Sequence, residues 1–179
     1  MDNTMIVAQN YDYQAVRTAV YGLKTSYPFL RLRSIGKSVI GRDLFGLELG
    51  HPQASKVLYA GAFHGMEHIT CPLLLRFCEK LCRAANENGM VSGIAARHAI
   101  QGRGILIIPM VNPDGCELVQ HGEKSVGERG VRLKKIAGGD FSRWNANARG
   151  VDLNHNFDAG WRELQQMERE AGIYGPSPK

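Results

Sequence analysis

The sequence of 179 residues contains no apolar run near the roughly 18 residues that a membrane-spanning helix needs. It also has no basic and then apolar leader of the secretory kind, because it opens with Met1-Asp2-Asn3-Thr4. Cysteine is scarce: four residues are too few for a disulfide framework, and they fit a reducing compartment. These absences predict a cytoplasmic protein, with a secreted or cell-wall-associated one as the alternative if an upstream signal is missing from the sequence.

Internal repeats and low-complexity linkers are also absent, so residues 1–179 are expected to form one domain. The 22 Lys and Arg residues exceed the 17 Asp and Glu residues, which gives a net charge of +5. This excess is spread along the chain, apart from a mixed stretch over 124–135 that is typical of a solvated loop. We therefore expect neither a nucleic acid nor a membrane as partner.

Hydrophobic spacing predicts strands that alternate with helices. Asp12 is a candidate cap for a helix that runs to Ser26. Strand-like pieces follow over 31–50, and then a short apolar run over 56–62 that is typical of a strand buried on both faces.

A second helix is expected from Thr70, its candidate cap, through Cys82, and a weaker one over 92–100. Three cysteines share a face of the Thr70 helix: Cys71, Cys78 and Cys82. They are predicted to be core residues, although a thiol metal site is conceivable. Another buried strand over 104–109 completes a strand–helix–strand order, which predicts an α/β fold with helices packed on the faces of a sheet. Beyond it, Asn112-Pro113-Asp114-Gly115 is predicted to be a turn, and 122–149 a long loop.

The segment from Gly61 to His68 carries the clearest chemical signal. His64 and Glu67 form His-x-x-Glu directly after a predicted strand, where open α/β sheets place their sites. An imidazole nitrogen and a carboxylate oxygen brought together by a turn supply two of the three protein ligands of a catalytic zinc. One alternative is structural, with Glu67 at a helix start where its charge suits the helix dipole. Another is the inverted zincin motif, in which His64 and His68 bind zinc from one helix turn and Glu67 is the base.

A second polar segment runs from Gly150 to Trp161. Asp152, Asn154 and Asn156 alternate with other residues, so an extended piece would present them on one side. Such side chains can hold a substrate's carboxylate or amide, and an aspartate can orient a ligating imidazole. The alternative is an Asx-rich turn that satisfies its own backbone.

Taken together, these motifs resemble the zinc carboxypeptidase family of metallopeptidases. The resemblance rests on four motifs in order: the Ile-Gly-x-Ser-x-x-Gly-Arg turn ending at Arg42, His64-x-x-Glu67, Asn-Pro-Asp-Gly over 112–115, and Gly-Val-Asp-Leu-Asn over 150–154. It covers the chain from about Tyr11 to Trp161. It implies a mixed twisted sheet with helices on both faces, and amide hydrolysis by zinc-activated water.

The resemblance also implies roles for individual residues. His64 and Glu67 would bind Zn²⁺, Asp152 would accept a hydrogen bond from His64, and Asn154 would face the peptide substrate. The sequence departs from the digestive carboxypeptidases, which have an arginine after the Gly-Val-Asp-Leu-Asn asparagine where this chain has His155. Asn145 stands where the oxyanion-stabilising arginine is expected.

Two further positions bear on the substrate. Met66 stands where many relatives have another substrate-contacting arginine, and Arg143 or Arg149 is a candidate for the oxyanion role. Loss of bidentate arginines weakens recognition of a C-terminal carboxylate. Phe-His-Gly-Met-Glu together with Asn-His-Asn-Phe resembles instead the bacterial branch that cleaves γ-D-glutamyl–diaminopimelate bonds, so the expected substrate is a murein peptide.

The family takes its third zinc ligand and its general-base glutamate from sequence beyond the region that this chain resembles. No histidine follows His155, and Glu163, Glu168 and Glu170 come too early to be that base. We therefore expect an incomplete catalytic domain that lacks the C-terminal part of the sheet, has its general base beyond Lys179, and has little activity alone. Two alternatives remain: a zinc-dependent deacylase of small acylated amino acids, and a non-catalytic remnant or partner-binding fragment.

Overall fold

A computed structural model describes Ile6 and residues 11–172 of the chain. Residues 1–4, on which the prediction of no secretory signal rests, lie outside the described residues. The chain divides into two compact units. The first comprises 1–37, 43–61 and 68–111, and the second comprises 38–42, 62–67 and 112–179. The expectation that residues 1–179 form one domain stays a prediction.

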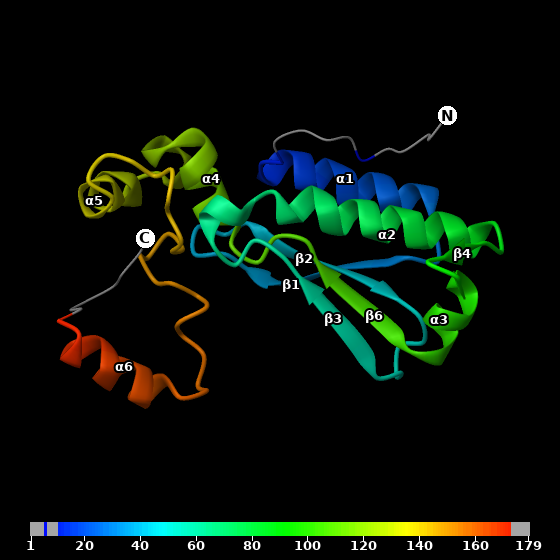
Figure 1. The fold of residues 1–179 in the computed structure, drawn as a ribbon. Coiled ribbons are helices and arrows are strands. Elements are labelled where there is room, and N and C mark those ends of the chain that lie inside the picture. The colour runs from blue at the N-terminus through cyan, green and yellow to red at the C-terminus, as the bar shows by residue number, and fades with distance from the viewer. Residues whose placement is uncertain (1–5, 7–10, 173–179) are drawn as a thin grey trace. The chain divides into compact units, whose positions relative to one another are not determined.

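The first unit is built on a four-stranded mixed sheet, as expected for the α/β class (Figure 1). Its strands are β1 (Arg31–Lys37), β2 (Asp43–Leu49), β3 (Lys56–Ala60) and β6 (Gly104–Ile108), in the order β1-β2-β6-β3. The β1–β2 and β2–β6 pairs are antiparallel, whereas β3 and β6 run parallel. The parallel pair is the one that a helical crossover joins, as the sequence order predicted.

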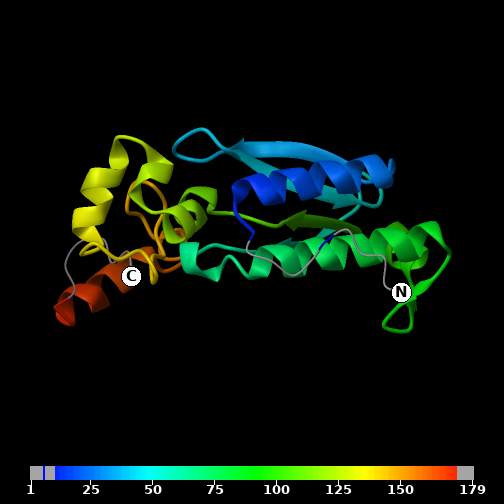
Figure 2. The same cartoon turned by 90° about the horizontal axis from the view of Figure 1, so that it is seen from above.

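Two long helices, α1 (Tyr13–Ser26) and α2 (Thr70–Asn86), lie side by side along this sheet (Figures 1 and 2). Asp12 caps α1 by accepting a hydrogen bond of 2.8 Å from the backbone N–H of Ala15, which confirms that prediction. The expected cap of α2 is wrong by one position: Thr70 is its first helical residue, and Ile69 precedes it without a side-chain cap bond. The three cysteines of α2 are fully buried in the core, as predicted.

The helix expected over 92–100 is partly replaced by a small hairpin. Strands β4 (Met90–Val91) and β5 (Ile94–Ala95) pair before α3 (Ala96–Gly102) begins. The prediction that the 56–62 strand is buried on both faces is also wrong. Leu58 is 58% exposed, and β3, which pairs only with β6 among the described residues, forms an edge of the sheet.

The second unit contains α4 (Pro113–His121), η2 (Glu123–Val126), α5 (Arg129–Ile136) and α6 (Trp161–Glu170). The predicted turn at 112–115 is instead the start of α4, with Asn112 as its cap and Pro113 in its first turn. The long loop predicted over 122–149 also folds, because its scattered apolar residues pack around Trp144, which is fully buried. These apolar residues lack the regular spacing of one helix face, so hydrophobic periodicity did not predict that the segment folds.

None of the helices within the described residues is both long enough and apolar enough to cross a membrane.

Candidate metal centre

A tight turn of the second unit carries His64 and Glu67. Ala62 has a positive φ of 51°, and the 3-10 helix η1 (Gly65–Glu67) follows. At Gly65 an added Cβ would lie 2.5 Å from the backbone oxygen of Gly115, so only glycine allows this approach. Since α2 starts only at Thr70, His64 and His68 do not share an α-helical turn, and the inverted zincin arrangement is not formed.

The side chains of His64 and Glu67 point at each other. Nδ1 of His64 lies 2.8 Å from Oε1 of Glu67, and Nε2 of the same ring lies 3.4 Å from Oδ1 of Asp152. Nε2 is buried, and its geometry toward Asp152 does not meet that of a hydrogen bond. One imidazole thus lies between two carboxylates, with Glu67 on its Nδ1 side and Asp152 on its Nε2 side.

These donors fit a zinc ion in kind and in direction. Two ligands at ordinary zinc distances stand about 3.3 Å apart in a tetrahedral site, so Nδ1 and Oε1 need to separate by only about 0.5 Å. The orphaned Nε2 is the atom that a carboxylate holds when the other ring nitrogen binds metal. Within the described residues, no third His, Cys, Asp or Glu ligand atom joins this pair within 4.8 Å.

Asp152 is held in an Asx turn rather than in the extended piece that its spacing predicted. Its Oδ1 accepts hydrogen bonds from the backbone N–H groups of Asn154, at 2.9 Å, and His155, at 3.3 Å. The alternative weighed for this segment, a turn that satisfies its own backbone, is therefore correct for the local structure. The same oxygen lies beside His64, so the turn also fixes where the carboxylate points.

The proposed substrate-facing residues differ in exposure. Asn154 and His155 are exposed, and Nδ1 of His155 lies 3.6 Å from Oε1 of Glu168 on α6. Asn145 is half-buried, and its Oδ1 is a buried acceptor without a hydrogen-bond partner. Arg143 and Arg149 are exposed.

Sequence reasoning missed two buried polar groups of this unit. Asn112 is 2% exposed and bonds to three different segments, and Asp114 is 1% exposed and accepts from Arg42 at 2.7 Å. The signal was present, because an Asn before a Pro is also the signature of a helix cap followed by a first-turn proline.

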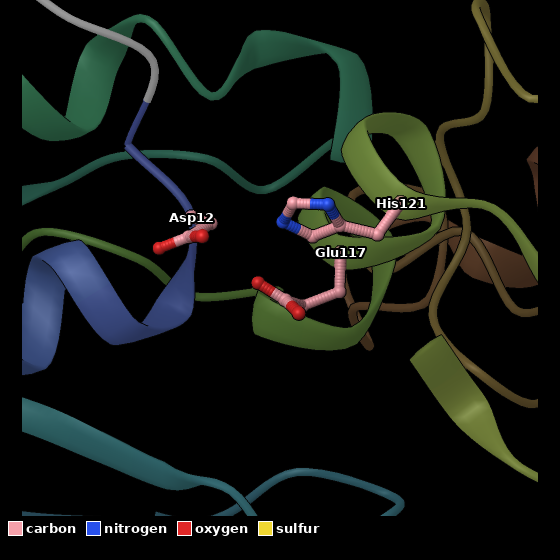
Figure 3. Close-up of side chains that lie close together, drawn as sticks. All are labelled: Asp12, Glu117 and His121. Carbon is pink, nitrogen blue, oxygen red and sulfur yellow. The ribbon is translucent and has the colours of Figure 1, made fainter. Parts of the chain in front are cut away.

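A second pair of metal-ligating types lies on α4. Glu117 and His121 stand one helical turn apart (Figure 3). Glu117 is already engaged by Arg42, whose Nη2 lies 3.4 Å from its Oε2. Asp12, labelled with them in Figure 3, caps α1 in the first unit. No metal site is assigned to these residues.

Known proteins show which family and fold this chain shares. A sequence model of the family described as "Zinc carboxypeptidase" matches residues 16–176. The crystal structure of thrombin activatable fibrinolysis inhibitor is similar to 89% of this chain, over 38% of its own, with a TM-score of 0.65 and 17% identity. Carboxypeptidase A from Helicoverpa armigera gives a TM-score of 0.61 with 22% identity, over 86% of this chain and 35% of its own.

Proteins that are similar in sequence over most of this chain support the family assignment. The protein YqgT of Bacillus subtilis (strain 168) is 33% identical over 94% of this chain and 46% of its own length. Gamma-D-glutamyl-L-diamino acid endopeptidase 1 of Lysinibacillus sphaericus is 31% identical over 96% of this chain and 42% of its own. The sheet and these matches define an α/β protein of a metallopeptidase family. The chain belongs to the zinc carboxypeptidase family, and it spans less than half the length of these two relatives.

Proposed function

We propose that this chain supplies part of the active site of a zinc-dependent peptidase that hydrolyses peptide amide bonds. The observation that carries the proposal is the placement of the His64 imidazole between Glu67, 2.8 Å from Nδ1, and Asp152, 3.4 Å from Nε2. Nδ1 and the Glu67 carboxylate would hold the ion, and Asp152 would orient the ring and raise its basicity. When bound, zinc polarises the substrate carbonyl and lowers the pKa of water.

The remaining residues have proposed roles toward the substrate. Asn145 offers a buried acceptor, Oδ1, with no partner of its own, which suits an N–H group of a peptide. Asn154 and His155 are exposed in the turn that Asp152 organises, where their side chains are accessible to a substrate. An amide and an imidazole accept and donate single hydrogen bonds, so recognition would not depend on a bidentate clamp of a terminal carboxylate.

We propose cell-wall peptides, with a γ-D-glutamyl–diaminopimelate bond, as the substrate class. The support is the motif pair Phe-His-Gly-Met-Glu and Asn-His-Asn-Phe, together with the relative named for γ-D-glutamyl-L-diamino acid endopeptidase activity. The four cysteines are buried and form no disulfide, which is compatible with action in the cytoplasm.

His64 and Glu67 are the two ligands that we propose among the described residues, whereas catalytic zinc takes three from protein. We therefore propose that the third ligand and the general base come from elsewhere, and that the 179-residue chain alone has little or no turnover. Appreciable zinc-dependent hydrolysis by the purified chain would contradict this part of the proposal.

A chimera tests the function directly. Residues 11–172 of this chain replace the matching region of the Lysinibacillus sphaericus endopeptidase, and zinc-dependent hydrolysis of a γ-D-glutamyl–diaminopimelate peptide is measured. We expect activity in the chimera, its loss with His64→Ala, and its retention with the matched control His68→Ala. A folded chimera that hydrolyses neither this peptide nor other peptides would favour a non-catalytic remnant, whereas one that takes only acylated amino acids would favour the deacylase.

A further inference from the structure

The side chain of Asn112 joins three backbone segments of the second unit. Its Nδ2 lies 3.1 Å from each of three carbonyl oxygens, those of Phe63, Asn145 and Ala146. Its Oδ1 accepts a hydrogen bond of 2.9 Å from the backbone N–H of Gly115. With 2% of its surface exposed, Asn112 has little access to water, so these bonds account for its polar atoms.

Only a carboxamide satisfies this arrangement. Nδ2 has two hydrogens for three acceptors, so at least one hydrogen is shared between two carbonyl groups. The opposite orientation of the amide would aim Oδ1 at three carbonyl oxygens, which repel it. An aspartate would add a negative charge at that point. A leucine would remove the donor to all three carbonyl oxygens, of which the Asn145 oxygen would keep only the N–H of Gly65, at 3.3 Å.

These bonds hold the loop that carries the metal-ligand pair. Phe63 directly precedes His64, and the backbone N–H of Asn112 also donates to the Ala62 oxygen at 2.9 Å. The 144–146 segment is fixed to the other side of the same loop, because the N–H of Met66 donates to the Trp144 oxygen at 3.0 Å. Asn112 thus binds the loop directly at residues 62 and 63. Through residues 145 and 146 it also binds the segment that holds the loop at Met66.

We infer that Asn112 is a positioning residue, whose carboxamide N–H groups set the separation and direction of the His64 and Glu67 ligand atoms. The inference rests on the proposed function, because it concerns metal binding by that pair. Partners that orient ligands contribute about 10- to 100-fold to metal affinity. We expect Asn112 to contribute to zinc affinity by a factor of this size, although none of its side-chain hydrogen bonds described above goes to the side chain of His64 or Glu67.

Two roles of Asn112 can be separated by substitution. Asn112→Ser keeps a good acceptor for the Gly115 N–H, and so keeps the helix cap, but removes the Nδ2 donors. Asn112→Asp also keeps the acceptor and removes the Nδ2 donors, in a side chain of nearly the same shape. A matched control is Leu133→Ala, which opens a cavity in the Trp144 cluster of the same unit without touching the loop at 62–67.

The probes are Zn²⁺ and Co²⁺ alone, added to the full 179-residue chain. Affinity is measured by competition with a chromophoric chelator, and ligand geometry by the visible absorption of Co²⁺. We expect Asn112→Ser and Asn112→Asp to bind about 10-fold or more weakly and to change the Co²⁺ spectrum at saturation. Leu133→Ala, at a comparable loss of stability in urea, should leave both unchanged. Equal effects of Leu133→Ala and Asn112→Ser, or unchanged binding in Asn112→Ser, would overturn the inference.

Two additional measurements keep the outcomes distinct. If His64→Ala binds zinc as the wild type does, the proposed function fails; if His64→Ala loses binding while Asn112→Ser keeps it, only the positioning role fails. Should neither Asn112 variant fold, the wild-type chain is titrated with urea below global unfolding. Zinc affinity should fall together with the hydrogen-exchange protection of the Asn112 carboxamide, and affinity that survives loss of that protection would contradict the role.

Discussion

Removal of the Asp114 carboxylate should destabilise the second unit more than the loss of any surface charge. Asp114 is 1% exposed and accepts from Ser38 Oγ at 2.8 Å, from the Ile40 N–H at 3.3 Å and from Arg42 Nη1 at 2.7 Å. In Asp114→Ala these donors lose their acceptor, and the Arg42 guanidinium keeps only its weaker partners. Breaking a buried ion pair in this way costs about 3–5 kcal/mol.

The lower end of that range applies here, because Arg42 still donates to the Ser125 oxygen at 2.9 Å and lies 3.4 Å from Glu117. With a urea dependence of about 2 kcal/mol per M, a loss of about 3 kcal/mol lowers the unfolding midpoint by about 1.5 M. The probe is the fluorescence of Trp144, which is fully buried, in a Trp161→Phe background.

The matched control is Glu123→Ala, which removes an exposed ion pair of the same unit, 2.8 Å from Lys134. It should leave the midpoint nearly unchanged, since exposed pairs contribute little. The double variant Arg42→Ala/Asp114→Ala should cost less than the sum of its single changes, because no unpaired charge remains. If Asp114→Ala lowers the midpoint no further than Glu123→Ala does, the buried Arg42–Asp114 pair does not stabilise the unit as described.

Three further predictions concern packing, thiols and pH. Gly65→Ala should weaken zinc binding and lower the free energy of unfolding in urea by about 1–3 kcal/mol, because its Cβ would lie 2.5 Å from the Gly115 oxygen. The control Gly22→Ala, in open space on α1, should raise the free energy of unfolding. Equal effects of the two substitutions would contradict this prediction. The four cysteines are fully buried, and the hydrogen bond with Cys82, together with burial, raises the pKa of the Cys78 thiol, so a thiol reagent should modify them only after unfolding. Burial raises the pKa of Tyr13 and of Tyr27, so the unfolded chain releases these phenolic protons first and the free energy of unfolding should fall as pH rises above about 10. Urea midpoints across that range, compared with Tyr13→Phe and Tyr27→Phe, should show a smaller fall in each variant, and an unchanged fall would contradict the assignment.

The first unit was largely predictable because its signals are local. The spacing of Val16, Val20 and Leu23 defines one face of α1, and Asp12 is a strong cap beside it. The buried strand β6 follows from its apolar run, and the helix α2 from the helical spacing of its apolar residues. The exposure of β3 was not predictable, because the burial of a strand depends on its neighbours in the sheet and not on its own residues.

The second unit was harder, because contacts between distant residues organise it. Asn112 and Asp114 were assigned to a turn from their composition, whereas their long-range hydrogen bonds to residues 63, 145 and 42 make them buried helix-start residues. The His64–Glu67 pair was found because three positions and a turn suffice to bring two ligands together. Its approach to Asp152, 88 positions away in the sequence, came from the family resemblance and not from any local pattern.

Zinc binding by the wild-type chain and three single variants tests whether His64 and Glu67 hold the ion. Dissociation constants from chelator competition are compared for the wild type, His64→Ala, Glu67→Gln and His68→Ala, each checked for native unfolding behaviour. We predict one bound ion in the wild type, loss of that ion with either of the first two changes, and wild-type affinity with His68→Ala. Zinc that stays bound after His64→Ala, or that is lost only with His68→Ala, would contradict this prediction.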